Sequence, residues 1–395
     1  PPRSTLFPYT TLFRSGHFYT RLSNPTAEAV ETKLAALEGG VGALMTSSGQ
    51  AASMIAVLTL CNSGDHFVAV SALYGGTVNL FNVTLKKLGV DVTFIDPNAS
   101  EQEIQAAIRP NTKAIFGETI ANPALVVLDI ERFAKIAHAN QIPLIVDNTF
   151  PTPILCRPFE FGADIVVHST SKYLDGHAVA LGGMIVDSGK FDWKASGKFP
   201  EFTTPDASYH GLVYTETFGA AAFIVKARVQ LMRDMGSAPS PMNAFLLNLG
   251  METVHLRMER HCRNAERVAA FLEKHPHVAW VNYPGLPSSK DYALAQKYLP
   301  NGCCGVIIAG IRGGREGAVR FMDNLKMAGI VVHVADARTC VLHPASATHR
   351  QLSDEQLVAA GISPELVRIS VGIEHVDDII RSEERRVGKE CRSRW

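Results

Sequence analysis

Two stretches decide the fold: PLIVDNTF at residues 143–150 and ADIVVHSTSKYLDGH at residues 163–177. In each stretch a short apolar run ends directly in polar side chains, which include Asp147 in the first and Lys172 in the second. Short apolar runs of this kind are typical of strands buried on both faces, as in a parallel sheet. Open α/β sheets bind their ligands at the carboxyl ends of the strands. We therefore expect Asp147 and Lys172 to lie at one edge of one sheet.

The same alternation extends outward from these stretches. Apolar runs and helical segments alternate along the first part of the chain, with runs near 41–46, 65–70, 90–96 and 112–118 and helices near 25–38, 77–88, 101–108 and 130–139. This order predicts an α/β fold with a mainly parallel sheet, flanked by helices on both faces. The pattern changes at SAPSP, residues 237–241, where a long helix over 243–274 leads into the apolar segments 277–286, 304–311 and 331–336. We expect an N-terminal arm and first helix over 16–40, a large domain over 41–240 and a smaller α+β domain over 241–380.

The two ends of the chain differ from the rest. When residues 381–395 are written as codons, the reverse complement of that string can encode residues 1–15 without a mismatch. Fifteen successive complementarities do not arise between unrelated protein segments, and the string resembles a sequencing adapter. The hypothesis is that residues 1–15 and 381–395 are non-native tails and that 16–380 is the natural segment, truncated at both ends.

Composition excludes several classes of protein. The 395 residues are 46% hydrophobic and 19% charged with a net charge of zero, which does not favour a nucleic-acid partner. No apolar run approaches the length of a membrane span, and the first residues lack a signal-peptide pattern. The seven cysteines are odd in number and form no C-x-x-C pair, so we expect reduced thiols, no metal site and a cytoplasmic location.

The turn at Ser48, Gly49 and Gln50 is suited to an anion. It follows an apolar run and opens a helix, whose first N–H groups and positive dipole end attract phosphate. The alternative is an ordinary helix cap, because Ser-Gly turns are common before helices. No G-x-G-x-x-G or Walker A motif is present, which disfavours a nucleotide site.

The polar residues after the two deciding strands suit one another chemically. A carboxylate such as Asp147 at the end of a buried strand needs a partner, and a protonated pyridine nitrogen is one. A partly desolvated Lys172 can form a Schiff base, and the hydroxyls of Ser169 and Ser171 can bind phosphate. Tyr74, in the turn ALYGGT, can lie flat on a planar cofactor. The alternatives are a capping aspartate, a solvated surface lysine and a packed turn tyrosine.

Taken together, the motifs resemble the Cys/Met-metabolism family of enzymes that depend on pyridoxal 5'-phosphate (PLP). The resemblance extends over nearly all of residues 16–380 and is carried, in the family's order, by FYTRLSNPT (18–26), LEGG (37–40), SSGQAA (47–52), YGGT (74–77), GETIANP (117–123), IVDNTF (145–150), HSTSKYLDGH (168–177), LRMERH (256–261), NYPGL (282–286), HPASATH (343–349) and VRISVGIE (367–374). Within the family, residues 197–212 and 335–352 are most similar to O-acetylhomoserine sulfhydrylases. The resemblance implies the PLP-dependent transferase fold, fold type I, with a seven-stranded sheet.

The resemblance also implies a role for each matching residue. Lys172 carries PLP covalently and moves protons, while Tyr74 stacks on the ring and assists proton transfer. The remaining implied cofactor contacts are Asp147 at the ring nitrogen, Ser48, Gly49, Gln50, Ser169 and Ser171 at the phosphate, and Tyr19 and Arg21 reaching the phosphate of a neighbouring subunit. The implied substrate contacts are Arg368 at the carboxylate, with Asn122 and Glu118 beside it. Sharing of sites in this way requires at least a dimer, and the family implies a homotetramer.

Two segments depart from the family pattern. Where sulfhydrylases commonly show G-H-G-T, this chain has Gly-His-Ala-Val at residues 176–179. Where the family commonly shows Asn or Ser shortly before a Gly-Asp pair, the chain has His333-Val-Ala-Asp at residues 333–336. Both changes concern the substrate side of the expected pocket.

The implied reaction is γ-replacement, in which O-acetyl-L-homoserine and sulfide or a thiol give L-homocysteine or L-methionine and acetate. The cofactor would provide the electron sink, and the protein would provide orientation and charge placement. The alternatives are a cystathionine γ-synthase or methionine γ-lyase type of activity, a catalytically inactive PLP-binding relative, or a structural α/β protein.

Overall fold

The computed structural model describes residues 16–347 and 363–387, with backbone only for 382–387. Residues 1–15 and 388–395 of the two predicted tails lie outside this part of the chain, whereas 381–387 continue helix α18 (Val376–Val387). The first described helix, α2 (Pro25–Glu38), begins where the Asn24 side chain accepts a hydrogen bond from the N–H of Thr26. It ends at Gly39, whose φ of 78° is favoured by glycine.

The larger sheet has seven strands in the order β1-β7-β6-β5-β4-β2-β3. Only β7 runs against its neighbours, so the prediction of a mainly parallel sheet is confirmed. In the pairing of β4 with β5, Glu118 lies opposite Asp147, and both residues end their strands. The strands are β1 (Gly42–Thr46), β2 (His66–Val70), β3 (Asp91–Ile95), β4 (Thr112–Glu118), β5 (Leu144–Asp147), β6 (Ile165–Ser169) and β7 (Gly183–Asp187).

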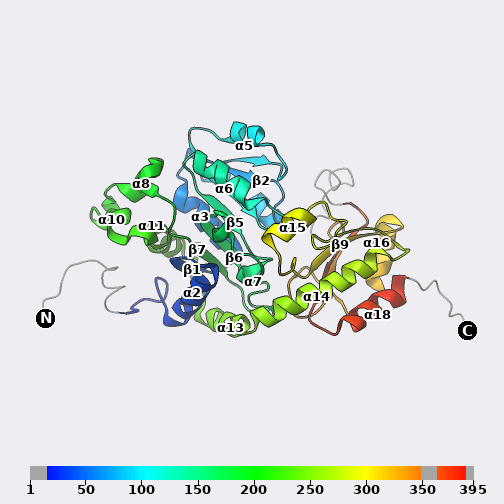
Figure 1. Cartoon of the computed structure of the whole chain (residues 1–395). Coiled ribbons are helices and arrows are strands. Elements are labelled where there is room, and N and C mark those ends of the chain that lie inside the picture. Colours follow the sequence, from blue (N-terminus) through cyan, green and yellow to red (C-terminus); the bar gives the residue numbers. More distant parts are fainter. Residues whose placement is uncertain (1–15, 348–362, 388–395) are drawn as a thin grey trace, which may run out of the picture.

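Helices cover both faces of this sheet, as Figure 1 shows. Successive strand residues point to opposite faces, so Ile145 and Val167 join one apolar core while Val146 and Val166 join the other. The helix expected over 77–88 is divided into α4 and a π-helical turn, η1. The remaining segments in this part of the chain are α3 (Gly49–Leu60), α4 (Gly75–Asn79), η1 (Leu80–Leu85), α5 (Glu101–Ala107), α6 (Ile130–Ala139), α7 (Thr152–Leu155), η2 (Pro158–Phe161), α8 (Trp193–Ser196), α9 (Pro200–Thr203), η3 (Ala207–Tyr209), α10 (Tyr214–Phe218), η4 (Gly219–Ala221), α11 (Ala222–Lys226), η5 (Ala227–Met232) and α12 (Arg233–Met235).

The single long helix expected over 243–274 is wrong, because the chain forms two helices there, α13 (Pro241–Glu252) and α14 (Val254–Glu273). They are separated at Thr253, with φ −111° and ψ 5°. The guanidinium of Arg257 donates to the carbonyl oxygen of Gly250 at 2.5 Å, which takes that acceptor out of regular helical pairing. The two helices run along the lower side of the molecule in Figure 1, and α14 continues beneath the second sheet.

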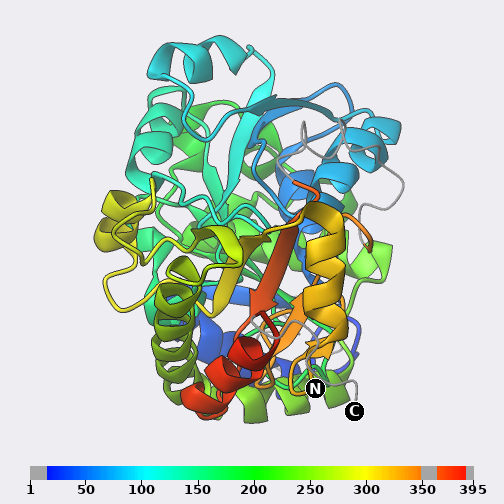
Figure 2. The ribbon, with the colours of Figure 1, turned by 90° about the vertical axis from the view of Figure 1, so that its right-hand side faces the viewer.

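The second sheet has five strands in the order β10-β11-β12-β9-β8, and its pairs are antiparallel except β10 with β11. Figure 2 views it from its own side, with the red helix α18 and the yellow-orange helix α16 before the sheet. The apolar segment 331–336 lies outside the strands. Ala335 there has φ 68°, which breaks a regular strand. The elements are β8 (Val278–Asn282), α15 (Tyr292–Tyr298), β9 (Val306–Ile311), α16 (Gly314–Asp323), β10 (Gly329–Ile330), β11 (Cys340–Leu342) and β12 (Leu366–Ser370).

Candidate active site

A cavity of about 880 Å³ lies at the carboxyl ends of the parallel strands and reaches the second sheet. This is the edge at which an open α/β sheet binds ligands. The volume suits a cofactor together with a small substrate, since ligand pockets hold roughly 300–1,000 Å³. Most of the predicted site residues line it, namely Ser48, Gly49, Gln50, Tyr74, Glu118, Asn122, Asp147, Ser169, Ser171, Lys172 and Arg368.

The turn at the start of α3 is packed so tightly that only glycine fits at its first helical position. Ser48 caps the helix by accepting a hydrogen bond from the N–H of Ala51 at 3.1 Å. A Cβ on Gly49 would lie 2.6 Å from Cβ of Ser169 and 2.8 Å from its Cα. The glycine therefore lets the end of β6 approach the N–H groups of the first helical turn, which are able to bind an anion.

A second glycine brings Tyr74 against this turn. A Cβ on Gly76 would lie 2.5 Å from Cε1 of Tyr74 and 2.7 Å from Nε2 of Gln50. The backbone N–H of Tyr74 donates to Oε1 of Glu118 at 2.7 Å, and the N–H of Asn122 donates to Oε2 at 3.2 Å. Glu118 thus holds the tyrosine turn and the asparagine on one side of the cavity.

Asp147 is a half-buried carboxylate whose hydrogen-bond partners are neutral. Its Oδ1 accepts from the N–H of Thr149 at 2.9 Å and from the Thr149 hydroxyl at 2.5 Å. Within the described side chains, no lysine, arginine or histidine forms an ion pair with it. Burial raises the pKa of Asp147, and burial together with the Asp147 carboxylate raises the pKa of Glu118 well above its usual range. A cation bound in the cavity would reverse this effect on Asp147.

Lys172 lies in a segment that hydrogen bonds hold on two sides, from Gly182 before β7 and from Arg257 on α14. The Ser171 hydroxyl pairs with the backbone of Gly182, with Oγ accepting from its N–H at 3.0 Å. Behind the lysine, the Arg257 guanidinium donates to the carbonyl oxygen of Tyr173 at 2.6 Å. Burial, and then the positive charge of Arg368, lowers the pKa of Lys172 from 10.5 to about 8. A larger fraction of the amine is therefore unprotonated near neutral pH than for an exposed lysine.

Arg368 brings the second sheet into the site. It lies on β12, is 6% exposed, and its Nη1 donates to Oδ1 of Asn122 at 3.2 Å. Its Nη2 donates to the carbonyl oxygen of Val332 at 2.8 Å. The side chain has no ion pair with a described carboxylate, so the guanidinium can donate hydrogen bonds to a substrate carboxylate.

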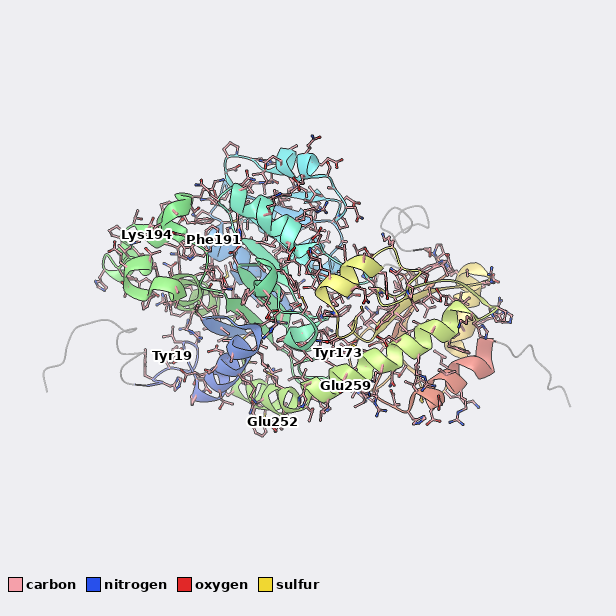
Figure 3. The ribbon with its side chains drawn as sticks, viewed as in Figure 1. Tyr19, Tyr173, Phe191, Lys194, Glu252 and Glu259 are labelled. Atoms are coloured by element: carbon pink, nitrogen blue, oxygen red, sulfur yellow. The ribbon has the colours of Figure 1, made fainter. Side chains whose placement is uncertain are left out.

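Tyr19 and Arg21 do not line the cavity of their own chain. Arg21 Nη1 donates to the carbonyl oxygen of Arg233 at 2.6 Å, and its guanidinium lies over the Tyr19 ring, 5.1 Å from the ring centre. Figure 3 labels Tyr19 well apart from Tyr173, the neighbour of Lys172. A single chain therefore does not bring these two residues to the other predicted site residues.

Sequence reasoning did not assign Thr149, His333 or Arg257 to the site. Thr149 follows Asp147 by two residues, the spacing at which a side-chain carboxylate accepts from the backbone, and this signal was available. Arg257 lies in the motif LRMERH, but its contact with the lysine segment spans 84 positions of sequence. His333 was visible only as a departure from the family pattern. Its Nδ1 lies 3.4 Å from Nζ of Lys172.

The residues present fit a phosphorylated pyridine aldehyde. The Gly49 turn offers N–H groups to a phosphate, Asp147 offers a negative charge to a ring nitrogen, and Lys172 offers an amine to an aldehyde. A family model of the Cys/Met metabolism PLP-dependent enzymes matches residues 7–384. The chain belongs to this family.

Relatives and a solved structure agree with this assignment. The chain is 48% identical over 374 residues to an O-acetyl-L-homoserine sulfhydrylase of Leptospira meyeri, covering 92% of this chain and 84% of the relative. It is 50% identical over 370 residues to a homocysteine synthase of Schizosaccharomyces pombe, covering 92% and 85%. A structure assigned as an O-acetylhomoserine (thiol)-lyase of Campylobacter jejuni, which holds N'-pyridoxyl-lysine-5'-monophosphate, matches with a TM-score of 0.91 at 37% identity, over 96% of this chain and 91% of that one. The predicted family, fold type I and PLP cofactor are thereby confirmed.

Proposed function

We propose that this enzyme catalyses γ-replacement: O-acetyl-L-homoserine and sulfide, or a small thiol, give L-homocysteine, or L-methionine, and acetate. The observation that carries the proposal is the convergence of Lys172, Asp147 and Arg368 on one cavity in a chain 47–50% identical to several O-acetylhomoserine sulfhydrylases and homocysteine synthases. The cavity also offers a buried guanidinium for the carboxylate of an amino-acid substrate.

Each residue has a distinct task in this proposal. Arg368 binds the substrate carboxylate as a bidentate fork and so orients the α carbon. When bound, PLP supplies an electron sink for negative charge at that carbon, and Asp147 stabilises the protonated ring nitrogen. Lys172 removes and returns protons, a task for which a pKa of about 8 is well matched. Tyr74 covers the ring and assists proton transfer near the leaving acetate.

The test is product analysis of purified enzyme with O-acetyl-L-homoserine, with and without sulfide. γ-Replacement gives homocysteine and acetate only when sulfide is present, whereas γ-elimination gives 2-oxobutanoate and ammonia without it. Lys172→Ala should abolish turnover and the borohydride-reducible yellow band, and Lys194→Ala, an exposed lysine labelled far from the site in Figure 3, should alter neither. Sulfide-independent 2-oxobutanoate as the main product would contradict the proposal.

We infer that a second copy of the chain completes each site. Tyr19 and Arg21 lie outside their own cavity, and α13 carries exposed Met242, Phe245 and Leu249. Asn243 of this helix donates to the carbonyl oxygen of Leu181, in the loop after the lysine. An apolar surface beside the site supports a dimer that shares residues, and the family implies two such dimers in a homotetramer.

Mixed subunits test this inference. Lys172→Ala and Arg21→Ala enzymes should each be weak alone, and refolding them together should restore activity at sites built from one intact lysine and one intact arginine. Activity of the mixture that equals the sum of the separate enzymes would count against shared sites.

For the location of the enzyme, we infer a reducing compartment, the cytoplasm. All six cysteines in the described part of the chain are free buried thiols. The described chain also holds no helix with the length and apolar character needed to cross a membrane.

A further inference from the structure

The segment that carries His333 is held in place by side chains of the second sheet. The Cys340 thiol on β11 donates to the carbonyl oxygen of His333 at 3.4 Å. On β12, Oγ of Ser370 accepts from the N–H of Ala335 at 2.8 Å. These bonds replace the strand pairing that residues 332–336 lack, so the fold itself sets where the imidazole lies. His333 lines the cavity beside Lys172.

The imidazole contacts the reacting amine directly. Nδ1 of His333 lies 3.4 Å from Nζ of Lys172. A lysine ammonium has hydrogens to donate and no lone pair, so in this contact Nδ1 is the acceptor and Nε2 carries the hydrogen of the ring. Nε2 is buried and finds no hydrogen-bond partner among the described residues. The contact with Lys172 is thus the polar interaction that orients the ring.

We propose that His333 is a positioning residue for the proposed γ-replacement, which holds the free Lys172 amine by accepting its hydrogen bond on Nδ1 and keeps it aimed into the cavity. The expected effects on kcat and KM rest on the proposed function, whereas the expected effect on cofactor recombination does not. It concerns this chain in particular, because the family commonly places Asn or Ser at this point. The Nδ1 acceptor of an imidazole lies as far along the side chain as the Oδ1 of Asn, but unlike Asn or Ser the imidazole loses this acceptor when it gains a proton.

The charges around the ring favour the neutral form that this role needs. The groups that face His333 are Lys172 and Arg368, which are cationic, and Asp336 and Asp175, which are anionic. Burial, and then the charge of Lys172, lowers the pKa of His333 below its ordinary value of 6.5. The ring is therefore neutral at pH 7, and it loses its acceptor when the pH falls through its own pKa.

The first experiment follows cofactor recombination, which does not depend on turnover. Apoenzyme is mixed with PLP over a range of pH, and the rate of appearance of the borohydride-reducible band gives the pKa of the Lys172 amine, since only the unprotonated amine attacks. In His333→Leu the acceptor that stabilises the ammonium form is lost, so the acid dissociation constant of Lys172 should rise by about tenfold, the worth of one hydrogen bond to a charged group. Val331→Ala, in the same segment with a side chain 44% exposed, should match the wild type.

The second experiment compares kinetics. His333→Leu should lower kcat about tenfold with little change in KM for O-acetyl-L-homoserine, because Arg368 bonds only to backbone oxygens of this segment. His333→Asn retains an acceptor at the same point of the side chain, so it should keep most of kcat. The fall in kcat that we expect for the wild type as the pH drops through the pKa of His333 should be smaller in this variant.

Three outcomes decide the matter. A shifted recombination profile in His333→Leu, with rescue in His333→Asn, supports the role. A His333→Leu recombination profile that coincides with that of the wild type overturns it. An unchanged loss of kcat at acidic pH in His333→Asn also overturns it, and this measurement remains available if His333→Leu does not fold. Wild-type enzyme that recombines with PLP but makes no homocysteine would refute the proposed function and leave the recombination test of His333 standing.

Discussion

Replacing Gly49 by alanine is the sharpest test of the proposal that the turn at residues 48–50 binds the phosphate of PLP. The added Cβ would lie 2.6 Å from Cβ of Ser169, whereas ordinary contact begins at 3.4 Å, so the start of α3 and the end of β6 must separate by 0.8 Å. The atoms in the way belong to the Ser169 backbone and its Cβ, which no rotamer change can move. A phosphate held between the two elements at a usual distance of about 2.9 Å would then be about 3.7 Å from one of them, beyond hydrogen-bond range.

The expected loss is one charge-assisted hydrogen bond, about 1.5–3 kcal/mol, which corresponds to roughly a ten- to hundredfold weaker binding of PLP. Overpacking should also lower the free energy of unfolding by about 1–3 kcal/mol. Fluorescence titration of apoenzyme with PLP measures the first effect and urea denaturation the second. Gly329→Ala is the matched control, because nothing lies within 4 Å of a Cβ at Gly329. If Gly49→Ala bound PLP as tightly as Gly329→Ala, the turn would not be the phosphate site.

Three other changes have defined outcomes. Asp147→Asn should weaken PLP binding by roughly tenfold or more. The raised pKa of Asp147 means that the folded apoenzyme loses stability as the pH rises and this carboxyl ionises, so the substitution should raise apoenzyme stability at neutral pH and not at low pH. Calorimetry at two pH values checks the sign. Arg257→Leu removes the donor to the buried carbonyl oxygens of Tyr173 and Leu174 and should lower the free energy of unfolding by about 3 kcal/mol or more, measured in urea. Ala178→Gly, at an exposed position with a φ of 56°, should raise stability by up to about 1 kcal/mol, seen as a higher Tm.

The sequence predicted those parts of the site that depend on local pattern. Asp147 and Lys172 follow buried apolar runs directly, and the rule for parallel strands brings such ends to one edge. Burial on both faces also made the strands readable, because the middle of each strand is mostly apolar. The second sheet was harder to read, since the segment 331–336 is rich in apolar residues but Val332, His333 and Ala335 bond to side chains instead of to a neighbouring strand.

Long-range side-chain contacts explain what the pattern could not predict. The break at Thr253 depends on Arg257, which bonds at once to Gly250 in the preceding helix and to Tyr173 beside the lysine. No periodicity within residues 243–274 carries that information. His333 likewise reaches Lys172 only because the second sheet holds its segment, across 161 positions of sequence.

These contacts tie the domain arrangement to the chemistry. In the lysine segment, the carbonyl oxygen of Tyr173 accepts a hydrogen bond from Arg257 on α14. The carbonyl oxygen of Gly176 accepts from the N–H of Ala337 at 2.8 Å, just beyond the His333 segment. A shift of the second sheet would therefore move Lys172, Arg368 and His333 together, although Lys172 follows a strand of the larger sheet. If PLP and substrate contact groups from both sheets, as proposed above, their binding should stabilise the arrangement that aligns the amine. Substitutions between the two sheets should then change turnover even where they touch no ligand.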